Sequence, residues 1–457
     1  MSLPPGSKAP RSLQLVKWIL DPMGYMNEAA RQYGDIFAVP AISRDSERPA
    51  IFVSHPEGLQ HLLSRDRGQD FTAPGEMNSI LEPIVGDRSL ILLSDRAHQR
   101  QRKLLMPPFH GDRMKTYGDT IREISDRVMA TLPHNRVFKM RSVMQNITLQ
   151  VIMQAVFGLE SGERYRELKP LLTQLTEFTS TPLNSSVLFF NFLQKDWGKW
   201  SPWGRMMATK KRIDELLYAE IRERRQQDCG DRQDILSLML RAQDEHGEGM
   251  SDRELHDELV TLLFAGHETT ASALAWAFYW LHQNPAISAK LLAELRELGP
   301  NPDSLSLYKL PYLTAVCSET LRIYPVGMLT FFRQTTQTVD LMGYHLPPLM
   351  PIAACIYLAH RRPETYPNPE QFRPERFLER DFSPYEFLPF GAGARRCIGS
   401  ALALYEMKLV LATVLSRYSL ALCEKRPVQP QRRGVTLTPA TGVRMKITEV
   451  KAKQAIA

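Results

Sequence analysis

The residues best suited to chemistry surround a single cysteine, Cys397. The segment reads Phe390-Gly-Ala-Gly-Ala-Arg-Arg-Cys397-Ile-Gly399. A helix is expected directly after it, at about 401–417, and the free N–H groups at a helix start favour a negatively charged sulfur. Arg395 and Arg396 add positive charge, and the glycines leave one face of the sulfur open. These features suit a thiolate that serves as an axial metal ligand.

A lone cysteine is more often a small buried apolar residue, but the neighbouring residues argue otherwise. They match the haem-ligand signature of the cytochrome P450 superfamily, Phe-Gly-x-Gly-x-Arg-x-Cys-x-Gly, at all six fixed positions. The chain therefore resembles that superfamily. The resemblance implies a mainly α fold with a smaller β-rich part, and haem b (iron protoporphyrin IX) buried between a long central helix and the helix after the cysteine. Cys397 would bind the iron, with Phe390, Gly391 and Gly399 beside the haem.

A polar interruption lies in the long helix expected at 252–283. It reads Ala265-Gly266-His267-Glu268-Thr269-Thr270. The Thr269 hydroxyl can bond to the carbonyl of Ala265, four residues back, and open a bend. An ordinary core helix with a polar interruption is the alternative. The segment resembles the family's oxygen-activation motif, which implies that Glu268 and Thr269 govern proton delivery to bound O₂ and that Ala265 lies against the haem.

Basic residues could hold the two haem propionates. His98 and Arg102 are four residues apart, so they share one face of the helix expected at 92–106. In the family, a histidine and an arginine at this spacing bind a propionate, and Arg333 and Arg395 stand where other propionate contacts fall. Four donors for two carboxylates is a sensible balance of charge. A solvated basic face is the alternative interpretation.

An acid and a base, Glu319 and Arg322, share one face of the helix expected at 311–324. Alone, this spacing would favour an ordinary surface ion pair. Further along the chain, Pro374-Glu-Arg376-Phe follows. The resemblance then implies that Glu319, Arg322 and Arg376 form a buried, structural ion cluster below the haem. Losing one member of such a cluster would be costly.

Hydrophobic periodicity predicts the elements that position these residues. Helices are expected at 92–106 with Ser94 as N-cap, and at 112–131, 141–158, 206–227, 252–283, 311–324 and 401–417. A strand is expected at 50–54, and the tail alternates like a β-hairpin around Pro439 to Gly442. We expect one domain, 1–457, with a helix-rich body and a β-rich part from the N-terminal strands and from about 325–360 and 430–450.

Composition limits the class of protein. The net charge of +7 over 457 residues is mild and does not argue for nucleic acid. Five cysteines without Cys-x-x-Cys spacing favour a reducing compartment. The most apolar stretch, 259–281, is interrupted by His267 and Glu268, so no transmembrane segment is expected. The prediction is a cytoplasmic monomer of the soluble bacterial type, similar to cyanobacterial fatty-acid and terpene hydroxylases.

The resemblance implies a monooxygenase that uses O₂ and two external electrons to hydroxylate or epoxidise an apolar small molecule, such as a fatty acid or terpenoid. Candidate pocket residues lie on mostly apolar stretches. They are Leu262, Val326, Leu329, Thr330 and Thr436. No carboxylate anchor is evident. Residues 187–203 are rich in aromatic side chains, and either form an apolar entrance near a membrane surface or simply pack on the core.

The chain contains no flavin or nicotinamide motif, so electrons are expected from a separate ferredoxin with its reductase. A docking patch is predicted from basic residues near the cysteine, namely Arg96, Arg100, Lys103 and Arg396. Two alternatives remain. One is a peroxide-using or O₂-independent haem-thiolate enzyme, and the other is a haem sensor or carrier without turnover. The Glu268-Thr269 pair argues against both, because neither needs proton delivery to O₂.

Overall fold

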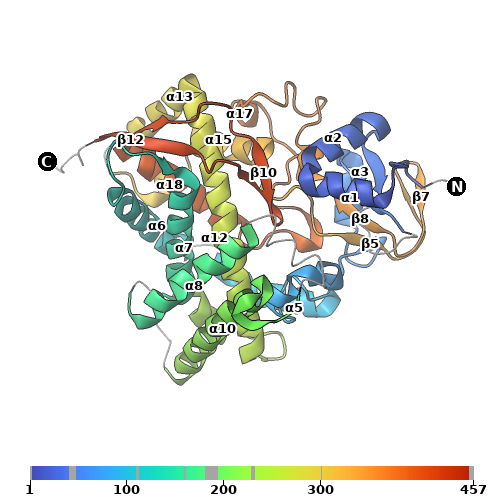
Figure 1. Ribbon diagram of the computed structural model, residues 1–457, viewed down its shortest axis with the longest axis horizontal. Coiled ribbons are helices and arrows are strands. Elements are labelled where there is room, and N and C mark those ends of the chain that lie inside the picture. Colours follow the sequence, from blue (N-terminus) through green and yellow to red (C-terminus); the bar gives the residue numbers. More distant parts are fainter. Residues whose placement is uncertain are drawn as a thin grey trace.

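Helices form most of the molecule, and the larger sheet lies at one side of them, beside the N-terminal helices (Figure 1). The computed structural model describes residues 3–40, 48–109, 113–158, 161–180, 194–227, 232–299 and 301–451. Among these residues, none of the helices combines the length and the apolar character needed to cross a membrane.

Helix α12 (Asp252–Gln283) is the axis of the helical body (Figure 1). It begins with a capping box, in which the Ser251 side chain accepts from the backbone N–H of Glu254 while the Glu254 side chain bonds back to Ser251. Helix α7 (Met140–Phe157) packs closely along it. At Gly266 a Cβ would lie 3.0 Å from Ile152, so glycine permits this close approach.

Helix α18 (Ser400–Arg417) begins directly after the cysteine segment and packs against α12 and α6 (Arg113–Ala130). Two glycines of that segment, Gly391 and Gly393, have φ of +65° and +70°, a region that other residues rarely adopt. A Cβ on Gly393 would also lie 2.3 Å from a carboxylate oxygen of Asp66. The cysteine loop is therefore fixed by backbone geometry as well as by the helix that follows it.

The other helical elements surround this centre. They are α1 (Arg11–Leu20), α2 (Pro22–Tyr33), α3 (Pro56–Ser64), α4 (Glu82–Val85), α5 (Asp95–Leu105), α8 (Glu163–Ser180), α10 (Pro202–Gln226), α11 (Ile235–Arg241), α13 (Pro285–Glu297), α14 (Ser304–Tyr308), α15 (Pro311–Ile323), α16 (Ile356–Ala359) and α17 (Arg376–Glu379). Short 3₁₀ turns are η1 (Gly75–Leu81), η2 (Pro107–Phe109), η4 (Gly198–Trp200) and η5 (Gly393–Arg395).

The β structure is divided among small sheets. The largest has the order β1 (Ile36–Val39), β2 (Ala50–Val53), β8 (Pro351–Ala354), β5 (Arg333–Thr335) and β3 (Phe71–Thr72), and only the β2–β8 pair within it is parallel. The others are β6 (Val339–Leu341) with β7 (Tyr344–Leu346), β10 (Pro430–Arg433) with β11 (Thr436–Pro439), and β4 (Phe138–Lys139) with β12 (Arg444–Val450) and β9 (Tyr418–Leu422).

The predicted hairpin around Pro439 to Gly442 is wrong, although both of its strands exist. β11 pairs with β10 across Gly434-Val435, whereas β12 pairs with β9 and β4. The chain changes sheets because its turn is tied to the start of α7. There Arg141 N–H donates to the carbonyl of Gly442 at 3.0 Å, and Met140 N–H donates to that of Val443 at 2.8 Å.

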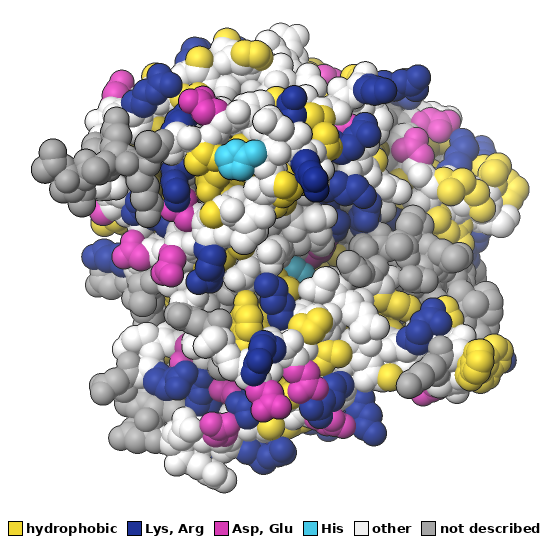
Figure 2. Space-filling view, turned by 60° about the vertical axis from the view of Figure 1, so that its left-hand side comes forward, with side chains coloured by type: hydrophobic (Ala, Val, Ile, Leu, Met, Phe, Trp, Pro, Cys, Tyr) yellow, Lys and Arg dark blue, Asp and Glu magenta, His cyan; other side chains and the backbone are white. Residues whose placement is uncertain are grey.

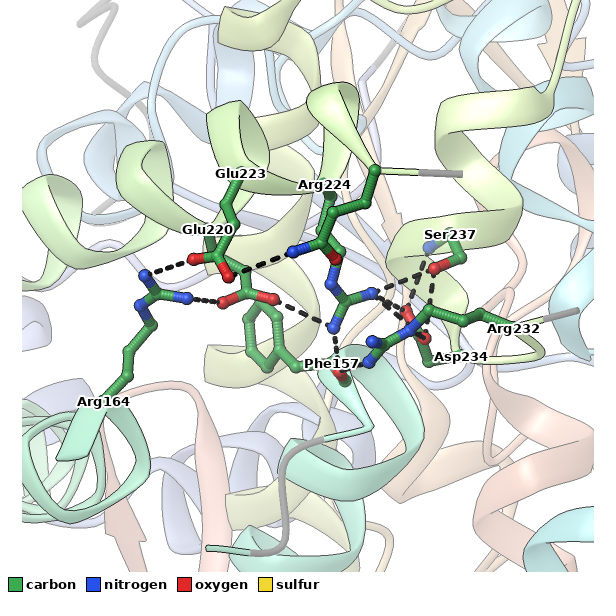
Figure 3. A network of polar contacts seen from close by, with 9 residues as sticks. Phe157, Arg164, Glu220, Glu223, Arg224, Arg232, Asp234 and Ser237 are labelled. Carbon is green, nitrogen blue, oxygen red and sulfur yellow. Dashed lines mark hydrogen bonds and ion pairs between the residues drawn. The ribbon is translucent and has the colours of Figure 1, made fainter. Parts of the chain in front are cut away.

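A network of charged residues joins the outer helices (Figure 3). Arg224 of α10, only 3% exposed, bonds to Asp234 at 2.9 Å, to the Ser237 hydroxyl at 2.9 Å and to the carbonyl of Phe157 at the end of α7. Its Nη2 also lies 2.9 Å from Glu220, which pairs with Arg164 of α8. The network therefore links α7, α8, α10 and the start of α11.

The aromatic segment 187–203 is described only in part, because 187–193 lies outside the described residues. In the described part, Trp197 is 68% exposed and Trp200 is 91% exposed. Trp203, by contrast, is partly buried and packs against the core. The described part therefore combines surface tryptophans with one that packs on the core, and an apolar entrance near a membrane surface stays a prediction.

Candidate functional site

The middle of α12 is accessible although the helix around it is buried. The residues before and after the middle, 255–263 and 270–279, are buried. In the middle, Ala265 is exposed and Thr269 is partly exposed. Cys397 is exposed as well, yet burial is the main influence on its pKa, which it raises. A sulfur that is accessible and also deep in the protein faces an internal space. These residues supply the surfaces that a flat cofactor between α12 and α18 needs.

The surroundings of Cys397 oppose the effect of burial. The N–H of Gly399 and the charges of Arg102 and Arg396 lower the pKa of its thiol. Its own N–H donates to the carbonyl of Phe390 at 3.0 Å, which holds the loop in shape. A bound metal ion deprotonates a coordinating thiol by its own charge. The site therefore fits a thiolate iron ligand.

Several basic side chains gather beside this sulfur, and of them Arg333 has a carboxylate partner. Burial lowers the pKa of His98, and the nearby positive charges of Arg395, Arg102 and Arg333 lower it further, to about 3. His98 is therefore neutral at pH 7. Burial and, after it, the positive charge of Arg333 lower the pKa of Arg395 to about 10. Arg333 is fully buried, and its Nε donates to Asp66 at 2.7 Å. This concentration of positive charge fits the two propionates of haem.

Arg102 and Arg395 make their hydrogen bonds to backbone carbonyls. Arg102 Nη1 donates to the carbonyl of Arg396 at 2.7 Å. Arg395 donates to the carbonyls of Ala73, Leu90 and Leu93, at distances between 2.5 and 3.1 Å. These bonds fix the 73–93 segment beside the cysteine loop, and they leave both guanidinium charges without a directly bonded carboxylate among the described residues.

Sequence reasoning missed Glu258, which supports the same segment from α12. The N–H of Leu90 donates to Glu258 Oε1 at 2.6 Å, and Gln101 Nε2 donates to the same oxygen at 3.1 Å. Burial raises the pKa of this fully buried carboxyl to about 8. An acid among the apolar residues of a long helix was a visible signal. The pairing of Asp66 with Arg333 left no signal in the sequence, because the two residues are far apart in the chain.

The carboxylate of Glu268 in α12 is held by side chains of α7. Glu268 is paired with Arg141, and it accepts a hydrogen bond from Gln145 Nε2 at 2.6 Å. The Thr269 hydroxyl donates to the carbonyl of Ala265 at 2.6 Å, which is the bond expected from the sequence. Neither Arg141 nor Gln145 could be predicted, because their role depends on how two helices pack. Glu268 and Thr269 are thus consecutive residues of α12, with the carboxylate bonded to α7 and the hydroxyl at the accessible part of the helix.

Comparison with known proteins agrees with this geometry. The family model described as Cytochrome P450 matches residues 4–447. The chain belongs to the cytochrome P450 family. Family members bind haem b through a cysteine thiolate, and this cytochrome P450 is accordingly a haem-thiolate monooxygenase.

Curated relatives and solved structures match over nearly the whole chain. "Putative cytochrome P450 135B1" of Mycobacterium tuberculosis is 34% identical over 454 residues, 98% of this chain and 92% of the relative. "Putative cytochrome P450 138" of Mycobacterium bovis is 32% identical over 447 residues, 97% and 96% of the two chains. The structure titled "Retinoic acid bound cyanobacterial CYP120A1" has a TM-score of 0.85 at 24% identity, covering 99% of this chain and 100% of that one. The cytochrome P450DA heme domain has a TM-score of 0.83 at 23% identity, covering 99% and 97%. Both structures support the fold.

The charged residues expected below the haem come together in this cytochrome P450. Arg322 donates to both carboxylate oxygens of Glu319, at 2.7 and 2.9 Å, and Arg376 Nε donates to Glu319 at 3.1 Å. Glu319 and Arg322 are fully buried, and Arg376 is 3% exposed. The cluster fixes α15 to the segment that leads toward the cysteine loop.

The candidate pocket residues differ in accessibility. Leu329 and Thr330 are partly exposed, whereas Leu262, Val326 and Thr436 are buried. The N–H of Leu437 donates to the carbonyl of Val326 at 2.8 Å, and Thr436 pairs with Gly327. The β10–β11 hairpin therefore lies against the segment 326–330, and Leu329 and Thr330 present the accessible part of that segment.

The predicted docking patch needs one correction. Arg100 is engaged inside the protein, because its Nε bonds to Asp244 at 2.5 Å and its Nη1 to Glu254 at 3.1 Å. Lys103 lies 3.5 Å from Glu245 at the surface. Arg96 and Arg396 are exposed, and so is Arg67, which lies close enough to Arg102 to lower its pKa. Of these three exposed arginines, Arg396 directly precedes Cys397, Arg67 lies close to Arg102, and Arg96 is on the same helix as Arg102.

Proposed function

We propose that this cytochrome P450 uses O₂ to hydroxylate or epoxidise an apolar small molecule of the fatty-acid or terpenoid class, with Glu268 and Thr269 delivering protons. The observation that carries the proposal is an acid followed by a threonine, Glu268 and Thr269, at the accessible middle of the otherwise buried helix α12, in a chain whose Cys397 is also accessible. The apolar wall at 326–330 supports an apolar substrate. A structural neighbour titled as bound to retinoic acid supports the same class.

Different residues of the chain have different roles in the proposed reaction. The bound haem iron supplies oxygen activation, with electron density from the Cys397 thiolate. Glu268 is held away from its neighbour by Arg141 and Gln145, so it must exchange these partners when it transfers a proton. The Thr269 hydroxyl donates to Ala265, and its oxygen can accept a proton or hydrogen bond from the accessible side. His98, Arg102 and Arg395 would hold the propionates of the haem.

The experiment that tests this function combines ligation and turnover. The carbon monoxide difference spectrum of the reduced protein reports thiolate ligation. Turnover with NADPH, a surrogate ferredoxin and its reductase under ¹⁸O₂ should then place one labelled oxygen atom in an oxidised fatty acid or terpene. Product formation with peroxide alone, and none with O₂ and electrons, would favour the O₂-independent alternative. Haem binding without any product would favour a sensor or carrier.

We further propose that the chain acts as one cytoplasmic domain, 1–457, as a monomer, and that a ferredoxin is its electron donor. The family match across residues 4–447 supports one domain. The exposed Arg67, Arg96 and Arg396 beside the cysteine loop suit an acidic donor. Light scattering of the haem-loaded protein tests the monomer, and the rate of reduction by a ferredoxin tests the donor.

A further inference from the structure

Helix α1 presents its residues in the opposite way to an ordinary surface helix, which buries its apolar side. Gln14 of α1 is only 2% exposed. Its Nε2 donates to the carbonyls of Ser7 and Ala9 at 3.1 and 2.7 Å, and its Oε1 accepts from the Tyr25 hydroxyl at 2.9 Å. Trp18, four residues later, packs edge-on against Tyr25. A polar side chain and one indole therefore fix the inner side of α1.

The outer side of α1 is apolar. Leu13 and Val16 are each 50% exposed, and Leu20 is 78% exposed. These residues are spaced by three and four positions, so they share one face of the helix, and Ile19 beside them is 39% exposed. Among the described residues, no other helix has more than one exposed large hydrophobic side chain. Hydrophobic side chains that are exposed singly are normal, whereas a face made of several marks a contact surface.

Positive charge borders this apolar face. Residues 3–20 include Lys8, Arg11 and Lys17, all of them exposed, and contain no Asp or Glu. Lys17 lies one helical turn from two of the exposed leucines. Its ammonium is 3.4 Å from Glu28 of α2, and both side chains are more than half exposed, so this pair is weak. The face therefore combines apolar side chains with cations that an anionic surface would attract.

We propose that α1 is a docking helix for the surface of an anionic lipid bilayer. A helix bound in this way buries its apolar face at the boundary of headgroups and acyl chains, and cations beside that face add attraction to anionic lipids. Lysine and arginine suit the border, because their apolar stems can be buried while their charges stay at the phosphates. The inference goes beyond the proposed function and does not depend on the substrate.

A second copy of this chain suits the face less well. In a symmetric dimer through α1, both copies would present the same surface to each other. The cations of residues 3–20 would then meet the same cations of the other copy, and like charges repel. An anionic bilayer instead accommodates the apolar side chains and the cations at the same time.

The test is co-sedimentation of the full-length, haem-loaded protein with lipid vesicles. The probes are vesicles of phosphatidylcholine alone and vesicles that also contain about 30% phosphatidylglycerol. The wild-type protein should partition into the anionic vesicles about tenfold more strongly than into the neutral ones, and added salt should weaken this preference. Lys8→Gln combined with Lys17→Gln should reduce the preference and leave binding to neutral vesicles unchanged.

Val16→Gln combined with Leu20→Gln should lower partitioning into anionic vesicles about tenfold or more, because the apolar face is lost. Val137→Gln combined with Leu378→Gln is the matched control, since it makes the same two changes at side chains that are 57% and 50% exposed elsewhere on the surface. It should leave partitioning unchanged. All four side chains lie at the surface, and the carbon monoxide spectrum of each variant verifies its fold.

Absence of wild-type binding to anionic vesicles, or equal partitioning of the Val16/Leu20 variant and the control, would overturn the proposal. A dimer seen by light scattering that only the Val16/Leu20 variant loses, without any vesicle binding by the wild type, would make a second copy the occupant and overturn it as well. If that variant unfolds, the comparison of the wild type with the lysine variant still decides. All of these outcomes leave the proposed function intact.

Discussion

At the scale of single residues, surroundings decide what a cysteine does. Cys317 and Cys355 are fully buried, and burial raises the pKa of each thiol to about 12, so neither thiol is ionised at neutral pH. Burial also raises the pKa of the Cys397 thiol, but the N–H of Gly399 and the charges of two arginines beside it oppose this shift. The same residue type is thus a core side chain in two places, while in the third its surroundings suit the iron ligand that we propose.

The proton-delivery role can be tested one side chain at a time. Glu268→Gln and Thr269→Ala should lower the product formed per NADPH consumed, by roughly 100-fold at most, because electrons then end in hydrogen peroxide. Haem binding and the carbon monoxide spectrum should stay unchanged. Thr270→Ala is the matched control, since the buried Thr270 hydroxyl makes the equivalent bond to Gly266 at 3.1 Å on the next position of the helix. Full coupling in Thr269→Ala would contradict the assignment.

At the scale of elements, the network around Arg224 should hold the outer helices together. Arg224→Met leaves the buried carboxylates of Glu220 and Asp234 without their shared partner. We expect the free energy of unfolding to fall by about 3–5 kcal/mol, measured by chemical denaturation of the haem-loaded protein. Arg164→Met, at the edge of the same network and 28% exposed, should cost about 1 kcal/mol or less. Similar losses of unfolding free energy for both variants would show that the buried centre of the network contributes no more to stability than its edge.

The contact between α10 and α12 should depend on pH through His256. This buried histidine lies between Asp214 at 3.0 Å and Asp257 at 2.8 Å. Burial acts to lower its pKa, but the hydrogen bonds with both carboxylates outweigh burial, so the pKa is raised. The stabilisation is therefore fully present below the unfolded value of about 6.5 and is lost as pH rises through the raised pKa.

We accordingly expect the difference in unfolding free energy between wild type and His256→Gln to shrink between pH 6 and pH 9. Chemical denaturation at several pH values measures it. His282→Gln is the control on the same helix, because burial lowers the pKa of His282, so its contribution should rise slightly as pH passes the unfolded value of about 6.5 and then stay constant, opposite in direction to that of His256. A difference for His256→Gln that does not change with pH would mean that the histidine is neutral in the folded protein.

Elements with strong periodicity or local signals were predictable, and those fixed by distant contacts were not. The helices around Glu268 and Glu319 were predicted close to their observed bounds, because each joins a long apolar pattern to a clear start. Helix α8, interrupted in pattern by Pro170, was missed. The tail was assigned to one hairpin because alternation reveals a strand but not its partner. The side chains that support the site, Asp66 and Arg141, come from elements far from it in sequence.

At the scale of the whole molecule, the face seen in Figure 2 has charge that is spread rather than concentrated. Figure 2 shows one face on which Lys and Arg side chains are interspersed with Asp and Glu, and hydrophobic side chains occur in small groups. A net charge of +7 distributed in this way gives little overall attraction for an acidic partner. Docking of an electron donor must then depend on a local group of cations. The candidates for such a group are the exposed Arg396, directly before Cys397 in the chain, Arg67, close to Arg102, and Arg96, on the helix of Arg102.

Charge reversal tests this local surface. Arg96→Glu combined with Arg396→Glu should slow reduction of the haem-loaded protein by a ferredoxin about tenfold at low ionic strength, because opposite charges speed the encounter of the two proteins. The effect should shrink at 0.5 M salt, where screening acts over a few ångströms. Arg136→Glu, an exposed arginine before β4, is the control and should change the rate little. Stopped-flow absorption at several salt concentrations measures the rate. If the double variant and the control are slowed equally, net charge rather than this surface governs the encounter, and the donor must dock elsewhere.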